Sequence, residues 1–310
     1  MKIKPNNKKV TSVRRILECV PNFSEGRDVE KIEKIVDPFR GKDGVKLLDY
    51  QNDEDHNRLV VTSVGSPEPL KKAVIEAMGA AIDVIDMRKH KGQHPRMGAV
   101  DVVPFIPLKN VDMKEAVGIS QEVAKEISKA HKLPVFLYEE SASRSQRRNL
   151  ATIRKGQFEG MAEKLKDSIW QPDYGPATIH PTAGVTAIGA RMPLVAYNVN
   201  LDTNQLNIAD AIAKKVRHIS GGLQYCKGIG IELKDRGIVQ VSMNMTDYTR
   251  TALYRVFELI RIEARRYGVN VIGSEIVGLV PLAALIDTAA YYLGLEEFTV
   301  KQVLETRIWE

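Results

Sequence analysis

Hydrophobic positions along the first 190 residues predict strands and helices in alternation. Short apolar or β-branched runs predict strands over 16–23, 45–50, 58–64, 100–107 and 134–138. Apolar residues spaced three and four apart predict helices over 28–39, 67–85, 112–131 and 147–166. Pro104 and Pro107 interrupt the run at 100–107, so we expect that strand to lie at a sheet edge, since proline cannot donate to a strand ladder.

The second half of the chain has a simpler pattern. Strands are predicted over 194–201, 225–233, 239–245 and 269–276, and helices over 205–218, 251–267 and 282–293. Without the last helix, this is the β-α-β-β-α-β order of ferredoxin-like folds. The first half fits the same order, with an additional helix and strand after it. We therefore predict an α+β protein of two ferredoxin-like subdomains, each a mixed sheet with helices on one face.

A proline-rich stretch separates the two halves. Pro172, Pro176 and Pro181 fall within 170–183, which is typical of a loop because proline fixes φ and removes a donor. We interpret 184–191 as part of the same connection, with glycines that let backbone approach a flat ligand closely. The expected domains are a basic extension over 1–14, an N-terminal subdomain over 15–190 and a C-terminal subdomain over 191–310. Two sheets meeting along a seam would leave a groove, where ligand sites are common.

Composition narrows the class of protein. Hydrophobic residues make up 44% and charged residues 27% of 310, as in globular proteins. No apolar run approaches the roughly 20 residues of a membrane helix, and no secretory signal is evident. Cys19 and Cys226 lie in apolar segments and are expected to be buried free thiols. We predict a cytoplasmic protein that does not bind a membrane.

The net charge of +6 raises the question of nucleic-acid binding. The basic clusters at 214–217 and 261–266 fall in amphipathic helices, where a solvated face explains them. No basic stretch is interleaved with aromatic residues, as single-strand binders require. Nucleic-acid binding is therefore a minor alternative.

The stretch 90–98, which reads His-Lys-Gly-Gln-His-Pro-Arg-Met-Gly, is the strongest candidate for chemistry. Gly92 and Pro95 oppose a continuous helix, so the spacing of His90 and His94 does not make a helical metal site. Metal ligation is a less favoured alternative because no cysteine or carboxylate cluster adjoins. General-base catalysis by an imidazole and a surface loop with hydrogen-bonded histidines are about equally supported by this stretch alone.

Two further stretches contain candidate ligand contacts. Asn22 and Ser24 follow a predicted strand, where open α/β sites collect such contacts. His56 and Arg58 follow an acidic turn, and Arg58 has the geometry to pair with a ligand carboxylate. Each stretch also fits an ordinary turn. The Gly228–Gly230 fragment lacks the third glycine and the context of a dinucleotide site.

Taken together, these segments resemble the glutamate formimidoyltransferase family. The resemblance is carried by 18–26, 85–99, 170–176, 196–201 and 273–281, and it runs in one order from about residue 15 to 290. It implies transfer of a formimino group from N-formimino-L-glutamate to tetrahydrofolate, a homodimer and no metal. His94, which precedes Pro-Arg-Met-Gly, matches the catalytic histidine of the family.

The resemblance also implies a folate-contacting loop. This loop consists of Gly175, Pro176, Ala177, Thr178, Ile179, His180, Pro181, Thr182, Ala183 and Gly184. Both substrates carry carboxylates, for which Arg58, Arg96 and Arg191 are the expected partners. Two positions depart from the animal pattern: Gln51 stands where we expect Asp, and Ala183 stands near an expected Trp that would offer a stacking surface.

Three alternatives remain beside this function. The same scaffold could use another donor, such as formiminoglycine or a formyl compound. The protein could bind folate without catalysis, or its basic charge could serve nucleic-acid binding. Of these, nucleic-acid binding is the least favoured.

Overall fold

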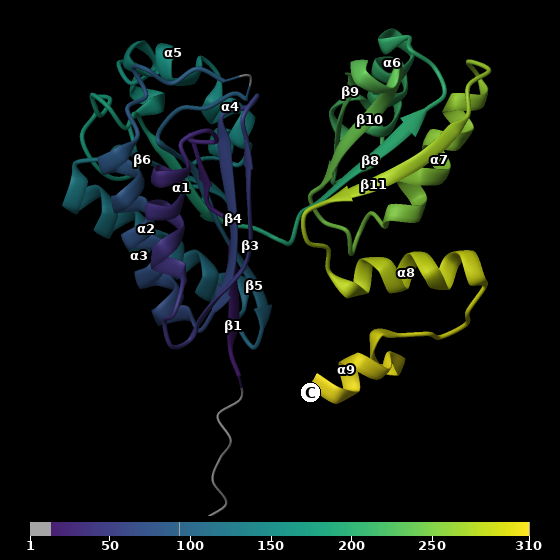
Figure 1. Ribbon diagram of the computed structural model, residues 1–310, viewed down its shortest axis with the longest axis horizontal. Helices are drawn as coiled ribbons and strands as arrows, with labels where there is room; N and C mark the ends of the chain where they lie inside the picture. The colour runs from purple at the N-terminus through teal and green to yellow at the C-terminus, as the bar shows by residue number, and fades with distance from the viewer. Residues whose placement is uncertain (1–13, 93, 310) are drawn as a thin grey trace, which may run out of the picture. The chain divides into compact units, whose positions relative to one another are not determined.

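The computed structural model describes residues 14–92 and 94–309, and nearly all of the expected extension 1–14 lies outside that range. The described chain forms two compact units, which divide between Arg191 and Met192. We refer to them as the N-terminal unit and the C-terminal unit. Both combine helices with a β-sheet, which confirms the predicted α+β class (Figure 1).

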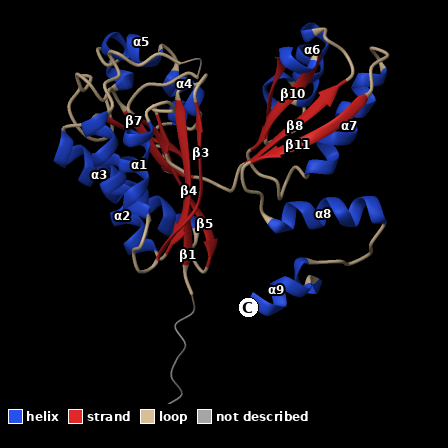
Figure 2. Cartoon of the chain, viewed as in Figure 1, coloured by secondary structure: helices blue, strands red, loops and turns tan. Residues whose placement is uncertain are grey.

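The N-terminal unit is built on a seven-stranded sheet (Figure 2). Its strands are β1 (Ile16–Cys19), β2 (Asn22–Phe23), β3 (Val45–Asp53), β4 (Arg58–Gly65), β5 (Val100–Lys109), β6 (Val135–Glu139) and β7 (Thr186–Ala190). β1 and β2 together lie between β5 and β4, and β3 pairs with the outer side of β4, all antiparallel. This is the strand order of a ferredoxin-like fold. β7 and then β6 extend the sheet beyond β5 in parallel.

Helices cover both faces of this sheet. The helices are α1 (Val29–Val36), α2 (Pro67–Val84), α3 (Met113–His131), α4 (Leu150–Arg154) and α5 (Gln157–Lys164). The side chains of Asp28 and Asp112 cap α1 and α3 by accepting from the backbone N–H three residues on. The first three helices pack on one face, in a core with Phe105 and Ile188.

The prediction of helices on one face is wrong for this unit. Phe136, Tyr138 and Ala187 point to the opposite face and pack with Ile153 of α4 and Met161 of α5. The reason is that β5, β7 and β6 run parallel, and strands of parallel sheets are apolar on both faces and must be covered on both.

The prediction that the strand over 100–107 lies at an edge is also wrong. β5 is central, with β1 and β2 on one side and β7 on the other. Pro104 lies opposite the interruption between β1 and β2, where Cys19 pairs with Phe105 and Asn22 with Val102. Pro107 faces a second register shift, between Ile16 and Leu17. Each proline therefore occupies an irregular position that does not require its missing donor.

The interpretation of 184–191 as a connecting loop is wrong as well, because it contains the buried strand β7. Its glycines serve contacts between strands. A Cβ on Gly189 would lie 2.2 Å from the carbonyl oxygen of Tyr138 in β6. Gly184, at φ +73°, approaches the backbone of Met97 in the same way. Close approach of backbone to backbone explains these two glycines without a ligand.

The C-terminal unit has a four-stranded sheet in the order β11-β8-β10-β9. Its strands are β8 (Val195–Leu201), β9 (Cys226–Leu233), β10 (Ile238–Met245) and β11 (Val271–Val277), and its helices are α6 (Leu206–Val216), α7 (Leu253–Arg265), α8 (Leu282–Leu293) and α9 (Leu304–Trp309). All three pairings are antiparallel, so the predicted mixed sheet is wrong here. In a split βαβ unit, a third strand lies between the two strands that a helix connects and runs antiparallel to both. Here β10 lies between β8 and β9, which α6 connects. α6 and α7 lie on one face of this sheet (Figure 2).

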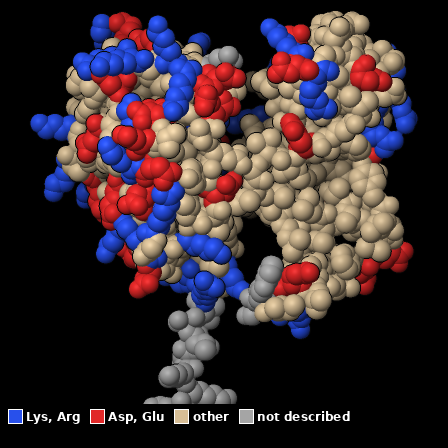
Figure 3. Space-filling model, in the orientation of Figure 1, with Lys and Arg blue, Asp and Glu red and all other residues tan. Residues whose placement is uncertain are grey.

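The surface charges, the cysteines and the helix lengths can each be compared with the sequence predictions. On the face of the N-terminal unit that Figure 3 shows, basic and acidic side chains lie interspersed. Surface charges of this unit also form ion pairs, as Lys71 does with Glu122 over 2.7 Å. Cys19 and Cys226 are buried and free, as predicted. Within residues 14–92 and 94–309, no helix combines the length and the apolar character that a membrane crossing requires.

Candidate functional site

Six residues that the sequence singled out line one narrow pocket of the N-terminal unit. They are Asn22, Ser24, His56, Arg58, His94 and Arg96, and the remaining lining residues are Phe23, Asn57, His90 and Asp101. Most of them come from β2 and the residue after it, from the turn between β3 and β4, and from the loop before β5. Their side chains lie close together, and the space that they enclose is too small for a water molecule.

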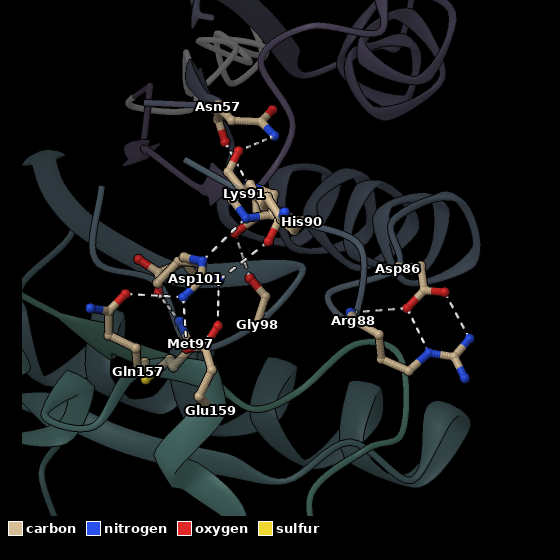
Figure 4. Close-up of polar contacts among 12 residues, drawn as sticks. Asn57, Asp86, Arg88, His90, Lys91, Met97, Gly98, Asp101, Gln157 and Glu159 are labelled. Atoms are coloured by element: carbon tan, nitrogen blue, oxygen red, sulfur yellow. Dashed lines mark hydrogen bonds and ion pairs between the residues drawn. The ribbon is translucent and has the colours of Figure 1, made fainter. Parts of the chain in front are cut away.

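Asn57 fastens these segments together. It has φ +48°, a conformation that asparagine tolerates better than most residues. Its side-chain oxygen accepts from the N–H of Gly26 over 2.8 Å, and its amide donates to the carbonyl of Lys91 over 3.0 Å (Figure 4). Its own carbonyl accepts from Nε2 of His90 over 2.9 Å. One buried side chain thus sets the relative positions of the turn that carries His56 and the loop that carries His94.

His90 has no free ring nitrogen. Because a carbonyl only accepts, Nε2 of His90 carries the proton in its bond to Asn57. Nδ1 then accepts from Nε of Arg96 over 3.1 Å. Burial lowers the pKa of His90, and this fits the neutral tautomer. His90 therefore positions its neighbours, and the alternative of a metal held by His90 and His94 loses one ligand.

Arg96 is buried and fully engaged within the protein. Its two terminal nitrogens donate to both carboxylate oxygens of Glu159 over 2.7 and 2.9 Å, and one of them also reaches Gln157 over 3.0 Å (Figure 4). The other reaches the carbonyl of His90 over 3.4 Å. A substrate carboxylate would have to displace Glu159 to pair with Arg96, so the contacts favour a positioning role for this residue.

His94 is half-buried and its side chain lines the pocket. Burial, which is the largest cause, and the positive charges of Arg58 and Arg154 together lower its pKa to about 3. The imidazole is therefore neutral at physiological pH, and one of its two ring nitrogens carries no proton. A neutral imidazole in a ligand pocket is able to accept a proton from a reacting group.

Positive charge exceeds negative charge around His94. Asp101, only 3% exposed, pairs with Arg154 and also accepts from the N–H of Met97 over 3.0 Å. Arg58 donates to the side-chain oxygen of Asn22, and its buried Nε has no partner among the described residues. Burial, which is the larger cause, and the charge of Arg154 together lower the pKa of Arg58 to about 10. A partly buried guanidinium without a carboxylate is unfavourable by itself and suits an anionic ligand.

His56 and Asp53 form a second polar pair at the pocket. Nδ1 of His56 lies 2.8 Å from one oxygen of Asp53, and the backbone N–H of His56 donates to the other oxygen over 2.8 Å. The rings of His56 and His94 are 6.3 Å apart between centroids and meet edge to face. Two imidazoles from different segments therefore border the same small space.

The loop 175–184 does not line this pocket. Residues 175–178 and Pro181 are exposed, whereas Ala183 and Gly184 are buried. Nδ1 of His180 accepts from the N–H of Ala183 over 3.0 Å, which closes a turn. The end of the loop is tied to the site's framework, because the carbonyl of Ala183 accepts from the N–H of Ala99 over 2.9 Å.

A wider opening adjoins both the pocket and this loop. Its volume is about 490 Å³, and its lining residues are Met87, Arg88, His90, Lys91, Gly92, Arg96, Gln157, Phe158 and Glu159. It shares His90 and Arg96 with the pocket. The carbonyl of Thr182 accepts from the N–H of Met87 over 2.8 Å, so the predicted folate loop borders this opening.

Arg191 lies elsewhere in the unit. It follows β7, and its N–H donates to the carbonyl of Phe105 over 3.0 Å. Its side chain interacts with Tyr138 and lies near Glu18. Asp101 and Phe105 are separated by four positions of β5, which is roughly 13 Å along a strand. The structure does not bring Arg191 to the pocket.

The two departures from the family pattern fall outside the pocket. Gln51 is exposed on β3, where its amide donates to Asp49 over 3.1 Å. Ala183 is buried in the core of the unit. Neither residue lines the pocket that contains His94, so neither departure alters the pocket directly.

Sequence reasoning missed Asn57, Asp101 and Arg154. Asp101 had a signal, since it is a lone charge in the apolar run at 100–107 and such a charge is buried only with a partner. Asn57 and Arg154 had none, because their roles depend on segments distant in sequence.

Comparisons with known proteins identify the family of this chain. The N-terminal subdomain of the formiminotransferase domain matches residues 16–191, and the formiminotransferase domain matches residues 196–308. A glutamate formimidoyltransferase of Streptococcus pyogenes serotype M1 is 55% identical over 95% of this chain and 99% of its own. The one from Thermoplasma acidophilum is 45% identical over 94% and 97%. A formimidoyltransferase-cyclodeaminase of Rattus norvegicus is 42% identical over 92% of this chain and 54% of its own. The chain belongs to the formiminotransferase family.

Proposed function

We propose that this protein transfers the formimino group of N-formimino-L-glutamate to N5 of tetrahydrofolate. The products are 5-formiminotetrahydrofolate and L-glutamate. The observation that carries the proposal is His94, a neutral imidazole in a small pocket with an excess of buried positive charge. The names of the two relatives that match nearly end to end support the same reaction.

The reaction needs a base at the attacking nitrogen. A bond forms between N5 and the formimino carbon, and N5 must then lose its proton. His94 takes this proton in our proposal. Burial chiefly depresses the pKa of His94 and makes the free imidazole a weak base, and an anionic substrate beside Arg58 would offset the additional effect of the positive charges. Substrate binding would thereby prepare the base.

The residues divide between the two substrates. Arg58 binds a carboxylate of the donor, with Asn22 holding the guanidinium in place. Ser24 donates to the carbonyl of Gly98 over 2.8 Å and keeps the pocket wall in register. Tetrahydrofolate, the co-substrate, occupies the wider opening beside the loop 175–184. The reaction requires no metal, because proton transfer and charge pairing supply its needs.

The proposal also covers the location, the oligomeric state and the partners of the protein. We infer a cytoplasmic homodimer that binds neither nucleic acid nor membrane. The paired surface charges of the N-terminal unit, such as Lys71 with Glu122, favour a solvated surface over a nucleic-acid site. Sedimentation velocity tests the dimer, and a gel shift at low salt tests nucleic-acid binding.

The decisive experiment measures the product. Purified protein is incubated with tetrahydrofolate and N-formimino-L-glutamate, and 5,10-methenyltetrahydrofolate is measured by its ultraviolet absorbance after acid treatment. We expect donor-dependent formation of this product. Formiminoglycine and a formyl compound serve as matched donors. If only one of these two compounds is turned over, that compound replaces N-formimino-L-glutamate as the donor. Folate binding without any transfer would overturn the enzymatic proposal.

A further inference from the structure

The proposed reaction involves two proton transfers. N5 loses a proton as it attacks, and the glutamate nitrogen must gain one before its bond to the formimino carbon breaks, because an amine leaves poorly as an anion. A single imidazole can serve both transfers in turn if it reaches both nitrogens, as the histidine of a Ser-His-Asp triad does. A second proton-bearing group at the same small pocket would instead divide the two transfers between two side chains.

Most lining residues cannot supply that proton. Both ring nitrogens of His90 are engaged, with Asn57 and with Arg96. Asp101 is an ion-paired carboxylate that accepts hydrogen bonds. Guanidinium groups such as Arg58 and Arg96 keep their protons at physiological pH. Among the titratable side chains that line the pocket in the described chain, His56 is the remaining one besides His94.

The contact with Asp53 fixes the tautomer of His56. A carboxylate only accepts, so Nδ1 of His56 carries a proton toward Asp53. Burial alone would raise the pKa of Asp53, but the backbone N–H and imidazole of His56 lower it, so this carboxylate stays ionised. An ionised carboxylate at Nδ1 holds the ring in one orientation and leaves Nε2 to exchange a proton with a ligand.

The turn that carries this pair is held tightly. A Cβ on Gly26 would lie 2.2 Å from the carbonyl oxygen of Asp53, and one on Gly92 would lie 2.2 Å from that of His56. The side chain of Asn57 bonds to the same two neighbouring segments. Although His56 is about half exposed, its backbone is thus packed against segments on either side. A positioned imidazole is what general-acid catalysis requires.

We propose that His56, oriented by Asp53, is the general acid that protonates the departing glutamate nitrogen. This inference rests on the proposed function. His94 takes the proton from N5 as the N5–carbon bond forms, and His56 gives its Nε2 proton to the glutamate nitrogen as the carbon–nitrogen bond breaks. No proton is gained or lost in total. Transfer from His94 back to His56, whose rings lie 6.3 Å apart, restores both residues for the next turnover.

The experiment compares His56→Gln with the wild-type protein on two donors. One donor is N-formimino-L-glutamate, and the other is N-formimino-4,4-difluoro-L-glutamate, whose amine is less basic because fluorine withdraws electrons. We expect His56→Gln to lower kcat about 100-fold with the first donor, the usual scale of general-acid catalysis. With the fluorinated donor we expect a loss of under about 10-fold, since its leaving group needs less protonation.

Variants of the neighbouring carboxylates provide a second readout. The other charged and titratable groups of the pocket are Arg58, His90, His94, Arg96 and Asp101, and all remain in these variants. Asp53→Asn should show an intermediate loss, whereas Asp55→Asn, which removes the same charge from the same turn, should stay within about twofold.

The outcomes separate this inference from the proposed function. Equal losses on both donors, or a loss in Asp53→Asn no larger than that in Asp55→Asn, would overturn the role of His56 as an acid oriented by Asp53. Wild-type turnover in His56→Gln would overturn it as well. Absence of transfer by the wild-type protein with either donor would instead reject the proposed function.

Discussion

Arg96 donates a hydrogen bond from Nε to Nδ1 of His90 over 3.1 Å, and this contact distinguishes the two histidines of the loop. It leaves His90 without a nitrogen for substrate, whereas His94 faces the pocket. We expect His94→Gln to lower turnover by a factor of roughly 100 or more at unchanged melting temperature. We expect His90→Gln to lower the melting temperature, because it breaks the contacts to Asn57 and Arg96.

Steady-state assays and thermal melts on both variants test this assignment. Gln keeps the approximate size of the side chain in each case, so the two variants are matched controls for one another. Near wild-type turnover in His94→Gln would reject its role as the base.

The protonation of His94 gives a pH prediction. Its pKa is lowered to about 3, whereas an unfolded histidine titrates near about 6.5. Between these values the unfolded chain binds more protons than the folded chain at this site. The contribution of His94 to the free energy of unfolding is therefore fully present above about pH 6.5 and is lost as the pH falls from there toward 3.

The measurement is chemical denaturation between pH 7 and 4. We expect the free energy of unfolding to decline less steeply in His94→Gln than in the wild-type protein, and NMR should show that the imidazole of His94 titrates well below its usual range. Identical slopes for the two proteins, with an ordinary histidine titration, would contradict the depressed pKa.

Removal of the unpaired charge at Arg58 should separate binding from stability. Arg58→Met is expected to raise KM for the donor by about 10-fold or more, the effect of losing a charge-assisted pair. We expect the melting temperature to stay constant or rise, because a buried guanidinium without a carboxylate is replaced by an apolar side chain.

Arg40→Gln is the matched control, since Arg40 pairs with Glu33 at the surface, away from the pocket. It should change neither KM nor stability by much. An unchanged KM in Arg58→Met would show that the donor carboxylate binds elsewhere.

Loss of one partner of the ion pair between Asp101 and Arg154 should, unlike loss of Arg58, lower the stability of the protein. Asp101→Asn leaves the charge of Arg154 buried without its partner and weakens the contact to the N–H of Met97. We expect the free energy of unfolding to fall by about 3 kcal/mol. In Asp101→Leu combined with Arg154→Met, no charge remains unpaired, so this double variant should lose less than Asp101→Asn in urea denaturation.

Gly98 tests the backbone contacts behind the site. A Cβ there would lie 2.1 Å from the carbonyl oxygen of Val185 and 2.6 Å from that of Ala183. We expect Gly98→Ala to lower the free energy of unfolding by at least about 2 kcal/mol, because the backbone of two segments would have to move apart. Gly118→Ala in α3 is the control, with no atom within 4 Å of the added group.

The control should stabilise the protein by about 0.5–1 kcal/mol, since alanine favours a helix over glycine. Thermal melts of both variants give the comparison. A Gly98→Ala protein as stable as the wild type would mean that the segments at Gly98 and Val185 are not held at this distance.

The sequence alone predicted most elements of the fold and half of the candidate site. The helices α2 and α3 and all strands of the C-terminal unit follow from local periodicity, which depends only on which face of an element is apolar. The pocket residues His94, Arg58 and Asn22 were identified by residue type and by their place at strand ends and turns. These properties are local, and a single sequence contains them.

Tertiary structure decided what depends on partners distant in the chain. The central position of β5 and the strand β7 follow from pairing between segments more than 80 residues apart, which neither proline content nor glycine content of one segment reveals. In the same way, Arg96 is committed to Glu159 while Arg58 has no carboxylate, although both arginines look equivalent in the sequence. The free energy of a buried charge or an imidazole proton depends on the groups within a few ångströms, and only folding brings those groups together.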